Sequence, residues 1–159
     1  METGIIRKLL PAEYSVLRTF LYHAIFLPDG VTPPPFEIVE QPELQVYTRD
    51  FGAGAWDTAF CAETNGRIVG AAWARIMDDY GHLDDETPSI AISLLPDCRG
   101  MGLGTKLLDA LLTDLRLRGC KAVSLSVQKE NPAVRLYRRA GFQTVAERGE
   151  EYLMRCQLR

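Results

Sequence analysis

The fold of this chain is decided by Ser89-Ile-Ala-Ile-Ser-Leu-Leu-Pro-Asp-Cys-Arg-Gly-Met-Gly-Leu-Gly-Thr-Lys-Leu-Leu108. Residues 89–95 are nearly all apolar, which is typical of a strand covered on both faces. From Leu103 leucines recur at four-residue steps, so residues 102–118 are predicted to form an amphipathic helix that Gly119 ends. The stretch is therefore predicted to be a buried strand, a glycine-rich turn and a helix.

The glycine-rich turn has a chemical use at this position. The first backbone N–H groups of a helix lack internal partners, and the helix dipole makes that end positive. Gly100, Gly102 and Gly104 would let a ligand approach the backbone closely, as in a diphosphate site. Arg99 would add a cation and Thr105 a hydroxyl.

Two common phosphate motifs do not fit these glycines. A nucleotide P-loop needs Gly-Lys followed by Ser or Thr, whereas the order here is Gly104-Thr105-Lys106. A dinucleotide fingerprint needs an acidic residue at the end of the next strand, which here ends in Val127-Gln128. A tight strand–helix turn without a ligand remains the structural alternative.

The pattern Arg99-x-x-Gly102-x-Gly104 resembles the acyl-CoA pyrophosphate loop of the GNAT family of N-acetyltransferases. Downstream, Asn131-Pro-Ala-Val-Arg-Leu-Tyr-Arg-Arg-Ala-Gly-Phe142 is similar to that family's Asn-x-x-Ala-x-x-x-Tyr-x-x-x-Gly-Phe segment. The spacing departs from the family's, since Ala133 comes two residues after Asn131 and Tyr137 six after it. The resemblance covers the chain from about Ala59 to the C-terminus, and the first third only in outline.

The resemblance implies one GNAT domain over residues 1–159, of mixed α/β class. Its central twisted mixed sheet is flanked by helices and splays between the fourth and fifth strands, where a pantetheine arm lies. The implied function is an acetyl-CoA-dependent N-acetyltransferase that acts on a primary amine of a small molecule, by direct transfer in a ternary complex. The alternatives are a protein N-terminal or lysine acetyltransferase and a non-catalytic acyl-CoA-binding regulator.

The resemblance also implies which residues bind the donor. Backbone groups of Ile92, Ser93 and Leu94 would pair with the pantetheine amides as another strand would. The other donor-binding residues would be the turn and the downstream segment: Arg99, Gly100, Met101, Gly102, Leu103, Gly104, Thr105, Asn131 and Tyr137. Asn131 also suits a helix cap before Pro132, and the two roles are compatible.

Tyr137 matches the family position of the general acid. A tyrosine of pKa ~10 keeps its proton at neutral pH and can donate it to the departing thiolate. The alternative is a core residue whose hydroxyl only binds CoA. The resemblance does not supply a general base, because the predicted fourth strand carries no ionisable group where the family often places Glu or His. Glu86, one step before Pro88 on the same parity, could act through a water or be a solvated loop acid, and His23 and His82 are weaker candidates.

Residues 78–86 form an acidic loop that would attract a cationic amine, or alternatively a solvated hairpin tip. Its acids are Asp78, Asp79, Asp84, Asp85 and Glu86. The aromatic residues that could line an acceptor pocket, or belong to the core, are Phe26, Trp56, Trp73 and Tyr80.

The periodicity elsewhere predicts a single mixed α/β unit. Asn65-Gly66 is a strong hairpin signal between two strands, and residues 28–41 form a proline-rich loop. Strands are predicted at 5–9, 57–63, 67–77, 87–95, 121–127, 142–146 and 152–158, and helices at 11–27, 42–51, 102–118 and 131–139. The last strand is interpreted as an exposed edge through which a homodimer would form.

Composition excludes several classes of protein. A formal charge of −3 gives no support for binding nucleic acid or an anionic membrane surface. No apolar run approaches the ~18 residues of a membrane span, and residues 1–7 do not resemble a signal peptide. The four cysteines are widely spaced, which favours reduced thiols in the cytoplasm over a disulfide framework or a metal site.

Overall fold

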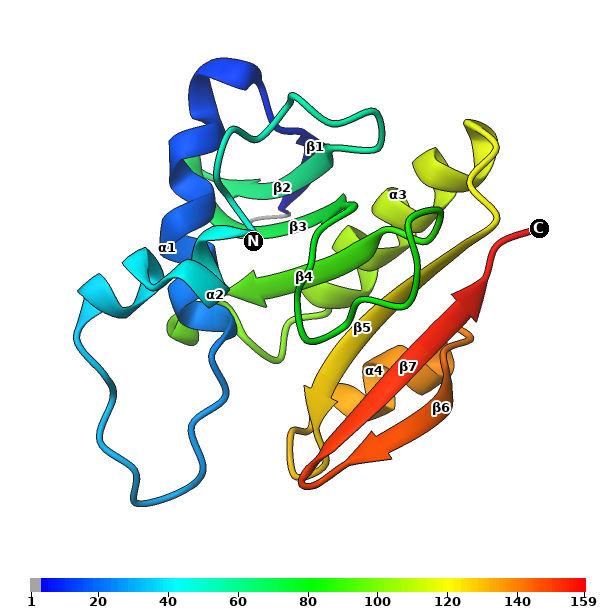
Figure 1. Cartoon of the computed structure of the whole chain (residues 1–159). Helices are drawn as coiled ribbons and strands as arrows, with labels where there is room; N and C mark the ends of the chain where they lie inside the picture. Colours follow the sequence, from blue (N-terminus) through cyan, green and yellow to red (C-terminus); the bar gives the residue numbers. More distant parts are fainter. Residues whose placement is uncertain (1–3) are drawn as a thin grey trace.

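The computed structural model describes residues 4–159, and these form a mixed sheet in the order β1-β2-β3-β4-β5-β7-β6 (Figure 1). Met1–Thr3, at the start of the segment tested for a signal peptide, lie outside the described residues. The strands are β1 (Ile5–Lys8), β2 (Thr58–Thr64), β3 (Arg67–Arg75), β4 (Ser89–Leu94), β5 (Ala122–Gln128), β6 (Gln143–Arg148) and β7 (Glu151–Gln157). All neighbours are antiparallel except β4 and β5, which run parallel.

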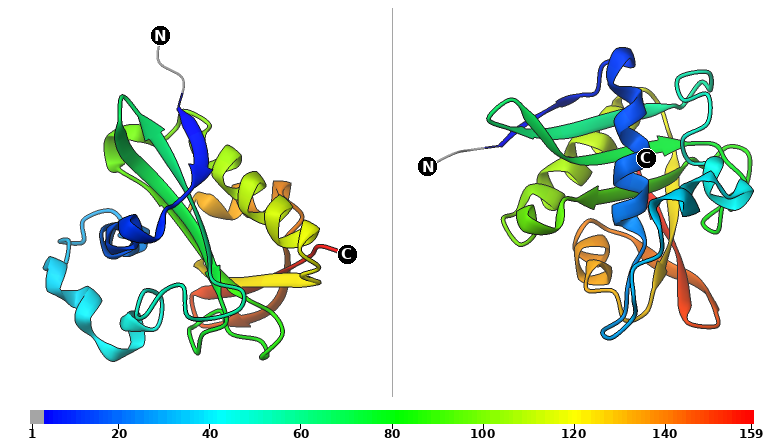
Figure 2. Two further views of the ribbon diagram at one scale, coloured as in Figure 1. Left: turned by 90° about the horizontal axis from the view of Figure 1, so that it is seen from above. Right: turned by 90° about the vertical axis from the view of Figure 1, so that its left-hand side faces the viewer.

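Helices cover both faces of the sheet. They are α1 (Leu17–Ala24), α2 (Pro42–Gln45), α3 (Leu103–Leu117) and α4 (Ala133–Arg139). Figure 2 shows α1 on one face, with α3 and α4 on the other. The leucine stripe of α3 builds one buried cluster with the sheet, and Leu17 and Phe20 of α1 build a second around Trp73. Figures 1 and 2 thus show the two-sided coverage that the apolar β4 sequence predicts.

Turn chemistry confirms the strongest local predictions. Asn65 and Gly66 have φ of +54° and +74°, the left-handed pair that a two-residue hairpin between β2 and β3 requires. Gly119 has φ of +94° directly after α3, so it ends the main helix as predicted.

The first third of the chain differs from the prediction. The predicted helix 11–27 is a 3₁₀ helix over Pro11–Val16 followed by α1, and the loop 28–41 contains a 3₁₀ helix at Phe36–Glu40. The predicted helix 42–51 is reduced to α2, followed by turns. The carbonyls of Val46, Tyr47 and Arg49 accept hydrogen bonds from side chains of β3, and these tertiary bonds compete with helical ones.

The interpretation of the final strand as an edge was wrong. β7 lies between β5 and β6, so β6 is the C-terminal edge of the sheet. The hairpin folds β6 back onto β7, because the Gly149 turn at φ +59° joins the two strands directly. Within residues 4–159 no helix is long and apolar enough to cross a membrane.

Candidate active site

The sheet opens between β4 and β5. Ser89 and Ser124 are the one residue pair that joins these strands in the described chain, and the strands diverge beyond it. Burial falls in the same direction, since Ser89 and Ile90 are buried whereas Ile92 and Leu94 are partly exposed. The structure therefore confirms the predicted splay, and Figure 1 shows β4 and β5 diverging.

The open edge of β4 presents free backbone groups. Successive residues of a strand direct their N–H and C=O groups to opposite edges. Ser124 donates to the carbonyl of Pro88, and Leu95 donates to Val69 of β3, so Ile92 and Leu94 direct theirs into the gap. Ser93 directs its backbone groups toward β3, and its hydroxyl donates to the carbonyl of Phe20 at 2.6 Å. A pantetheine arm can thus pair with Ile92 and Leu94, whereas this orientation does not favour the predicted contact of Ser93.

The glycine turn lies just beyond the end of β4. Gly100 and Gly102 have φ of +79° and +81°, a conformation that only glycine adopts without strain. Residues 99–102 are exposed, and nothing lies within 4 Å of where a Cβ of Gly100 or Gly102 would stand. Arg99 donates to the carbonyl of His23 at 3.2 Å, which ties the turn to the end of α1.

The first turn of α3 is free to bind an anion. In residues 4–159 no side chain caps this helix, and Lys106 is the first residue whose N–H reaches a carbonyl of the turn, that of Gly102. The backbone N–H groups before Lys106 have no helical partner and lie at the positive end of the helix dipole. The turn residues therefore fit a diphosphate, and their contact with one stays a prediction.

Gly104 brings three elements together. A Cβ built on Gly104 would stand 3.6 Å from Leu136 of α4 and 4.0 Å from Leu94 of β4. α4 thus lies beside the start of α3, on the far side of the gap from β4. Tyr137 follows Leu136 and is 8% exposed, with its ring packed edge-on against Phe142 at 5.7 Å.

The hydroxyl of Tyr137 is available for chemistry. It makes no hydrogen bond within the described part of the chain, and no buried polar side-chain atom there is left without a partner. The oxygen therefore reaches solvent at the edge of an otherwise buried ring. Burial raises the pKa of Tyr137 above its usual value, so the phenol keeps its proton.

Asn131 precedes α4 and caps it. Its Oδ1 accepts the N–H of Ala133 at 2.9 Å, which explains why the helix begins two residues later than predicted. The side chain is half-buried, and its donor contact stays a prediction.

Glu86 lies in an exposed loop, three residues before β4 begins. It does not continue the strand, so the parity argument that selected it does not apply to its side chain. Ile90, which has the same parity as Glu86 in the sequence, packs into the buried cluster under α3. The role of Glu86 as a base stays a prediction.

The two histidines lie elsewhere in the chain. His23 is half-buried, which lowers the pKa of its ring, and His82 Nδ1 lies 2.9 Å from the carbonyl of Met77.

The acids of the loop at residues 78–86 differ in their exposure to solvent. Asp79 is half-buried, whereas Asp78, Asp84 and Asp85 are exposed. Ser89 donates to Asp79 Oδ1 at 2.7 Å, and the hydroxyl of Tyr47 also hydrogen-bonds this carboxylate. Burial raises the pKa of Asp79 despite these bonds. Tyr47 carries no signal for this contact in the sequence, because only the folded chain brings the segment after α2 to this loop.

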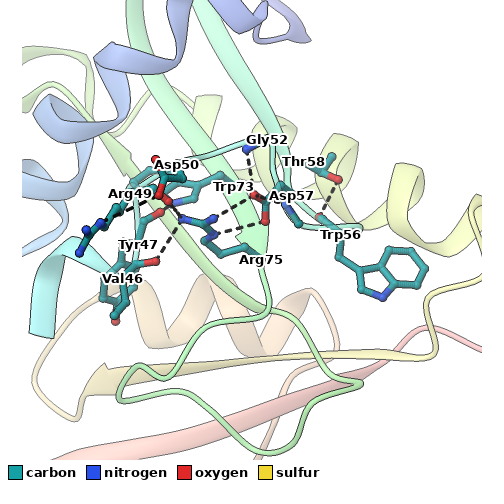
Figure 3. Close-up of polar contacts among 11 residues, drawn as sticks. Val46, Tyr47, Arg49, Asp50, Gly52, Trp56, Asp57, Thr58, Trp73 and Arg75 are labelled. Carbon is teal, nitrogen blue, oxygen red and sulfur yellow. Dashed lines mark hydrogen bonds and ion pairs between the residues drawn. The ribbon is translucent and has the colours of Figure 1, made fainter.

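A buried ion pair holds the segment that carries Tyr47 (Figure 3). Arg75 and Asp57 join through two hydrogen bonds of 3.0 and 3.2 Å, with side chains only 10% and 2% exposed. Arg75 also donates to the carbonyls of Val46 and Arg49 at 3.2 and 2.7 Å. The pair is therefore fully hydrogen-bonded, the condition under which a buried charge pair is tolerated.

Trp73 is a core residue and does not line an acceptor pocket, because it is fully buried. Its indole donates to the carbonyl of Tyr47 at 3.0 Å, so it supports the segment from below (Figure 3). Trp56 is half-buried under the Arg118 guanidinium, Phe26 is half-buried, and Tyr80 is 52% exposed beside Asp79. A cavity of about 500 Å³ lies apart from the glycine turn, between α1 and residues 39–51.

Comparison with known proteins identifies relatives. The acetyltransferase (GNAT) family profile matches residues 25–142. A mycothiol acetyltransferase of Thermomonospora curvata is 35% identical over 141 residues, which cover 74% of this chain and 46% of that protein. A second, from Thermobifida fusca, is 42% identical over 83 residues, 50% of this chain and 26% of that protein. The chain thus spans half or less of the length of these relatives.

Solved structures share the fold at low identity. A putative acetyltransferase from Salmonella typhimurium, solved with its cofactor acetyl-CoA, has a TM-score of 0.70 at 20% identity, over 99% of this chain and 95% of that one. The ribosomal-protein-S18-alanine N-acetyltransferase of Escherichia coli has a TM-score of 0.66 at 17% identity, over 98% and 94% of the two chains.

Proposed function

This chain belongs to the acetyltransferase (GNAT) family, and from that membership we propose that it transfers the acetyl group of acetyl-CoA to a primary amine of a small molecule. The observation that carries the proposal is the uncapped glycine turn of α3, which opens beside the gap between β4 and β5. A donor with a diphosphate and an extended arm needs both features at once.

Donor binding divides between the turn and the strand. The backbone of residues 100–105 would hold the pyrophosphate, with Arg99 and the Thr105 hydroxyl beside it. Each hydrogen bond to a charged oxygen contributes about 1.5–3 kcal/mol. Ile92 and Leu94 would pair with the arm and align it along β4.

Tyr137 is the proposed general acid. Its hydroxyl is solvent-reached and keeps its proton because burial raises its pKa. It can therefore protonate the thiolate as the carbon–sulfur bond breaks. Direct transfer is favoured over a covalent enzyme intermediate, because the Ser93 hydroxyl already donates to Phe20.

The names of the sequence relatives support a small-molecule acceptor, since several are mycothiol acetyltransferases. A protein N-terminus or lysine is the second candidate acceptor, and one structural neighbour bears such a name. A non-catalytic acyl-CoA-binding regulator is the third possibility. The free thiols of Cys61, Cys98, Cys120 and Cys156 in the described chain support a reducing, cytoplasmic location.

The test is an acceptor screen with free-thiol detection. The chain is incubated with acetyl-CoA and matched panels of small amines, amino acids and peptides, and CoA binding is measured separately by calorimetry. Acetylation of a small amine is the expected result. Acetylation of peptides alone would move the proposal to a protein acetyltransferase, and CoA binding without transfer to any acceptor would support the regulator.

A further inference from the structure

The carboxyl of Asp79 takes part in none of the steps above, yet donors from two other segments and from its own loop converge on it. Ser89, at the start of β4, donates to it at 2.7 Å. The hydroxyl of Tyr47, from the turn after α2, and the backbone N–H of Gly81 also hydrogen-bond it. Such a carboxyl is fixed in position and half-buried, whereas Asp78, Asp84 and Asp85 of the same loop are exposed.

The loop that carries Asp79 is packed onto β5. The Ser124 hydroxyl donates to the carbonyl of Gly81 at 2.6 Å. A Cβ on Gly81 would stand 2.9 Å from the backbone nitrogen of Ser126, so only glycine permits this close approach. Figure 1 shows the loop between β3 and β4 lying across β4 and β5. Asp79 is therefore held where these two strands meet.

That meeting point is the closed end of the gap. Ser89 and Ser124 join the strands, and the glycine turn follows the opposite end of β4. The five steps from Ser89 to Leu94 span about 17 Å at ~3.4 Å per residue. An arm anchored at the turn and aligned along β4 consequently directs its acyl end toward Ser89 and the Asp79 carboxyl.

Asp79 and Tyr137 approach the gap from opposite faces. Ser89 shares its parity with Ala91 and Ser93, which face α1, as shown by the bond from Ser93 to Phe20. Tyr137 belongs to the buried cluster on the α3 side. One group can therefore serve the incoming amine while the other serves the leaving thiolate, with the thioester between them.

We propose that Asp79 is a catalytic residue that binds the acceptor ammonium and takes its proton. This inference rests on the proposed function. The Asp79 carboxylate accepts one proton from R–NH₃⁺, and the neutral amine forms the C–N bond as the C–S bond breaks. The thiolate takes the Tyr137 proton, the tyrosinate takes the second amine proton, and Asp79 then releases its proton to water.

The surroundings suit this task. Burial makes the Asp79 carboxylate a stronger base by raising its pKa. Tyr47, from the segment after α2, is the titratable group beside Asp79, and Tyr80 from the same loop and Glu151 from β7 lie near Tyr47. Burial and Asp79 both raise the pKa of Tyr47, so it stays a neutral hydrogen-bond donor.

The test compares Asp79→Asn with Asp50→Asn, which removes the same charge from an exposed acid outside the acidic loop. We expect Asp79→Asn to lower kcat about 10²–10⁴-fold, whereas Asp50→Asn should keep the wild-type kcat. Both variants should keep the wild-type affinity for CoA. The low-pH limb that Asp79 sets in the wild-type kcat profile should be replaced in Asp79→Asn by a rise at higher pH, where the acceptor deprotonates in solution. Asp79→Glu should restore part of the original limb.

Thermal unfolding and carbon NMR of the side-chain carboxyls complete the test. NMR should show Asp79 titrating above the ordinary Asp pKa of ~3.9. An unchanged kcat–pH profile in folded Asp79→Asn, or an Asp79 that titrates at the ordinary value, would overturn the inference. A wild-type chain that binds CoA but acetylates no amine would instead defeat the proposed function, and NMR would still test Asp79.

Discussion

At the scale of the residue, removing the Tyr137 hydroxyl tests whether Tyr137 acts in catalysis or only in packing. Tyr137→Phe keeps the ring against Phe142 and removes only the proton donor. We expect kcat to fall about 10²–10⁴-fold, with CoA affinity changed by less than about 1 kcal/mol. Because burial raises the pKa of this phenol and a general acid must be protonated, wild-type kcat should show no loss from Tyr137 ionisation up to pH ~10. Near-normal kcat in the phenylalanine variant would make Tyr137 a packing or binding residue.

Arg75 illustrates the cost of a buried charge. Arg75→Met leaves Asp57, 2% exposed, without its cation, so we expect the free energy of unfolding to fall by about 3–5 kcal/mol. Arg49→Met is the control, because Arg49 and Asp50 pair on the surface at 4.0 Å and should contribute at most about 1 kcal/mol. Urea unfolding measures both. Equal losses in the two variants would show that the Arg75–Asp57 pair has no special weight.

At the scale of the element, the first turn of α3 is both a helix end and the proposed pyrophosphate site. Substitutions at Gly104 can separate helix stability from CoA binding. A Cβ at Gly104 meets Leu136 and Leu94 at ordinary contact distances, so Gly104→Ala should stabilise the helix by up to about 1 kcal/mol. Gly104→Glu should abolish CoA binding, through bulk and through repulsion of the diphosphate. Gly102→Glu should do the same with added strain, because Gly102 has φ of +81°. Calorimetry that finds wild-type CoA affinity in a folded glutamate variant would refute the pyrophosphate site.

At the scale of the whole molecule, the sheet ends at β6. Val145 on this edge is 50% exposed, and an unpaired edge strand favours pairing with a second copy. We therefore expect a homodimer joined through β6, and Val145→Lys should give a monomer. Light scattering at micromolar concentration measures both masses. A monomeric wild-type chain would contradict the expectation.

Local signals predicted much of this molecule. The apolar run of β4, the leucine stripe of α3 and the Asn65-Gly66 turn each act over a few residues, so their structures follow from neighbours in the sequence. The glycine turn belongs with them, because positive φ at Gly100 and Gly102 is a property of single residues.

Only the tertiary structure decided the remainder. In the sequence, Asp79 is one acid among five in its loop. Its burial depends on Tyr47 and Ser89, which lie 32 residues before and 10 residues after it. The short α2 reflects carbonyls drawn to Arg75 and Trp73, and the position of β6 depends on long-range pairing of β5 with β7. The strand, the turn and the helix were determined by local sequence, whereas the charged groups around them were selected by contacts that form only when distant segments pack.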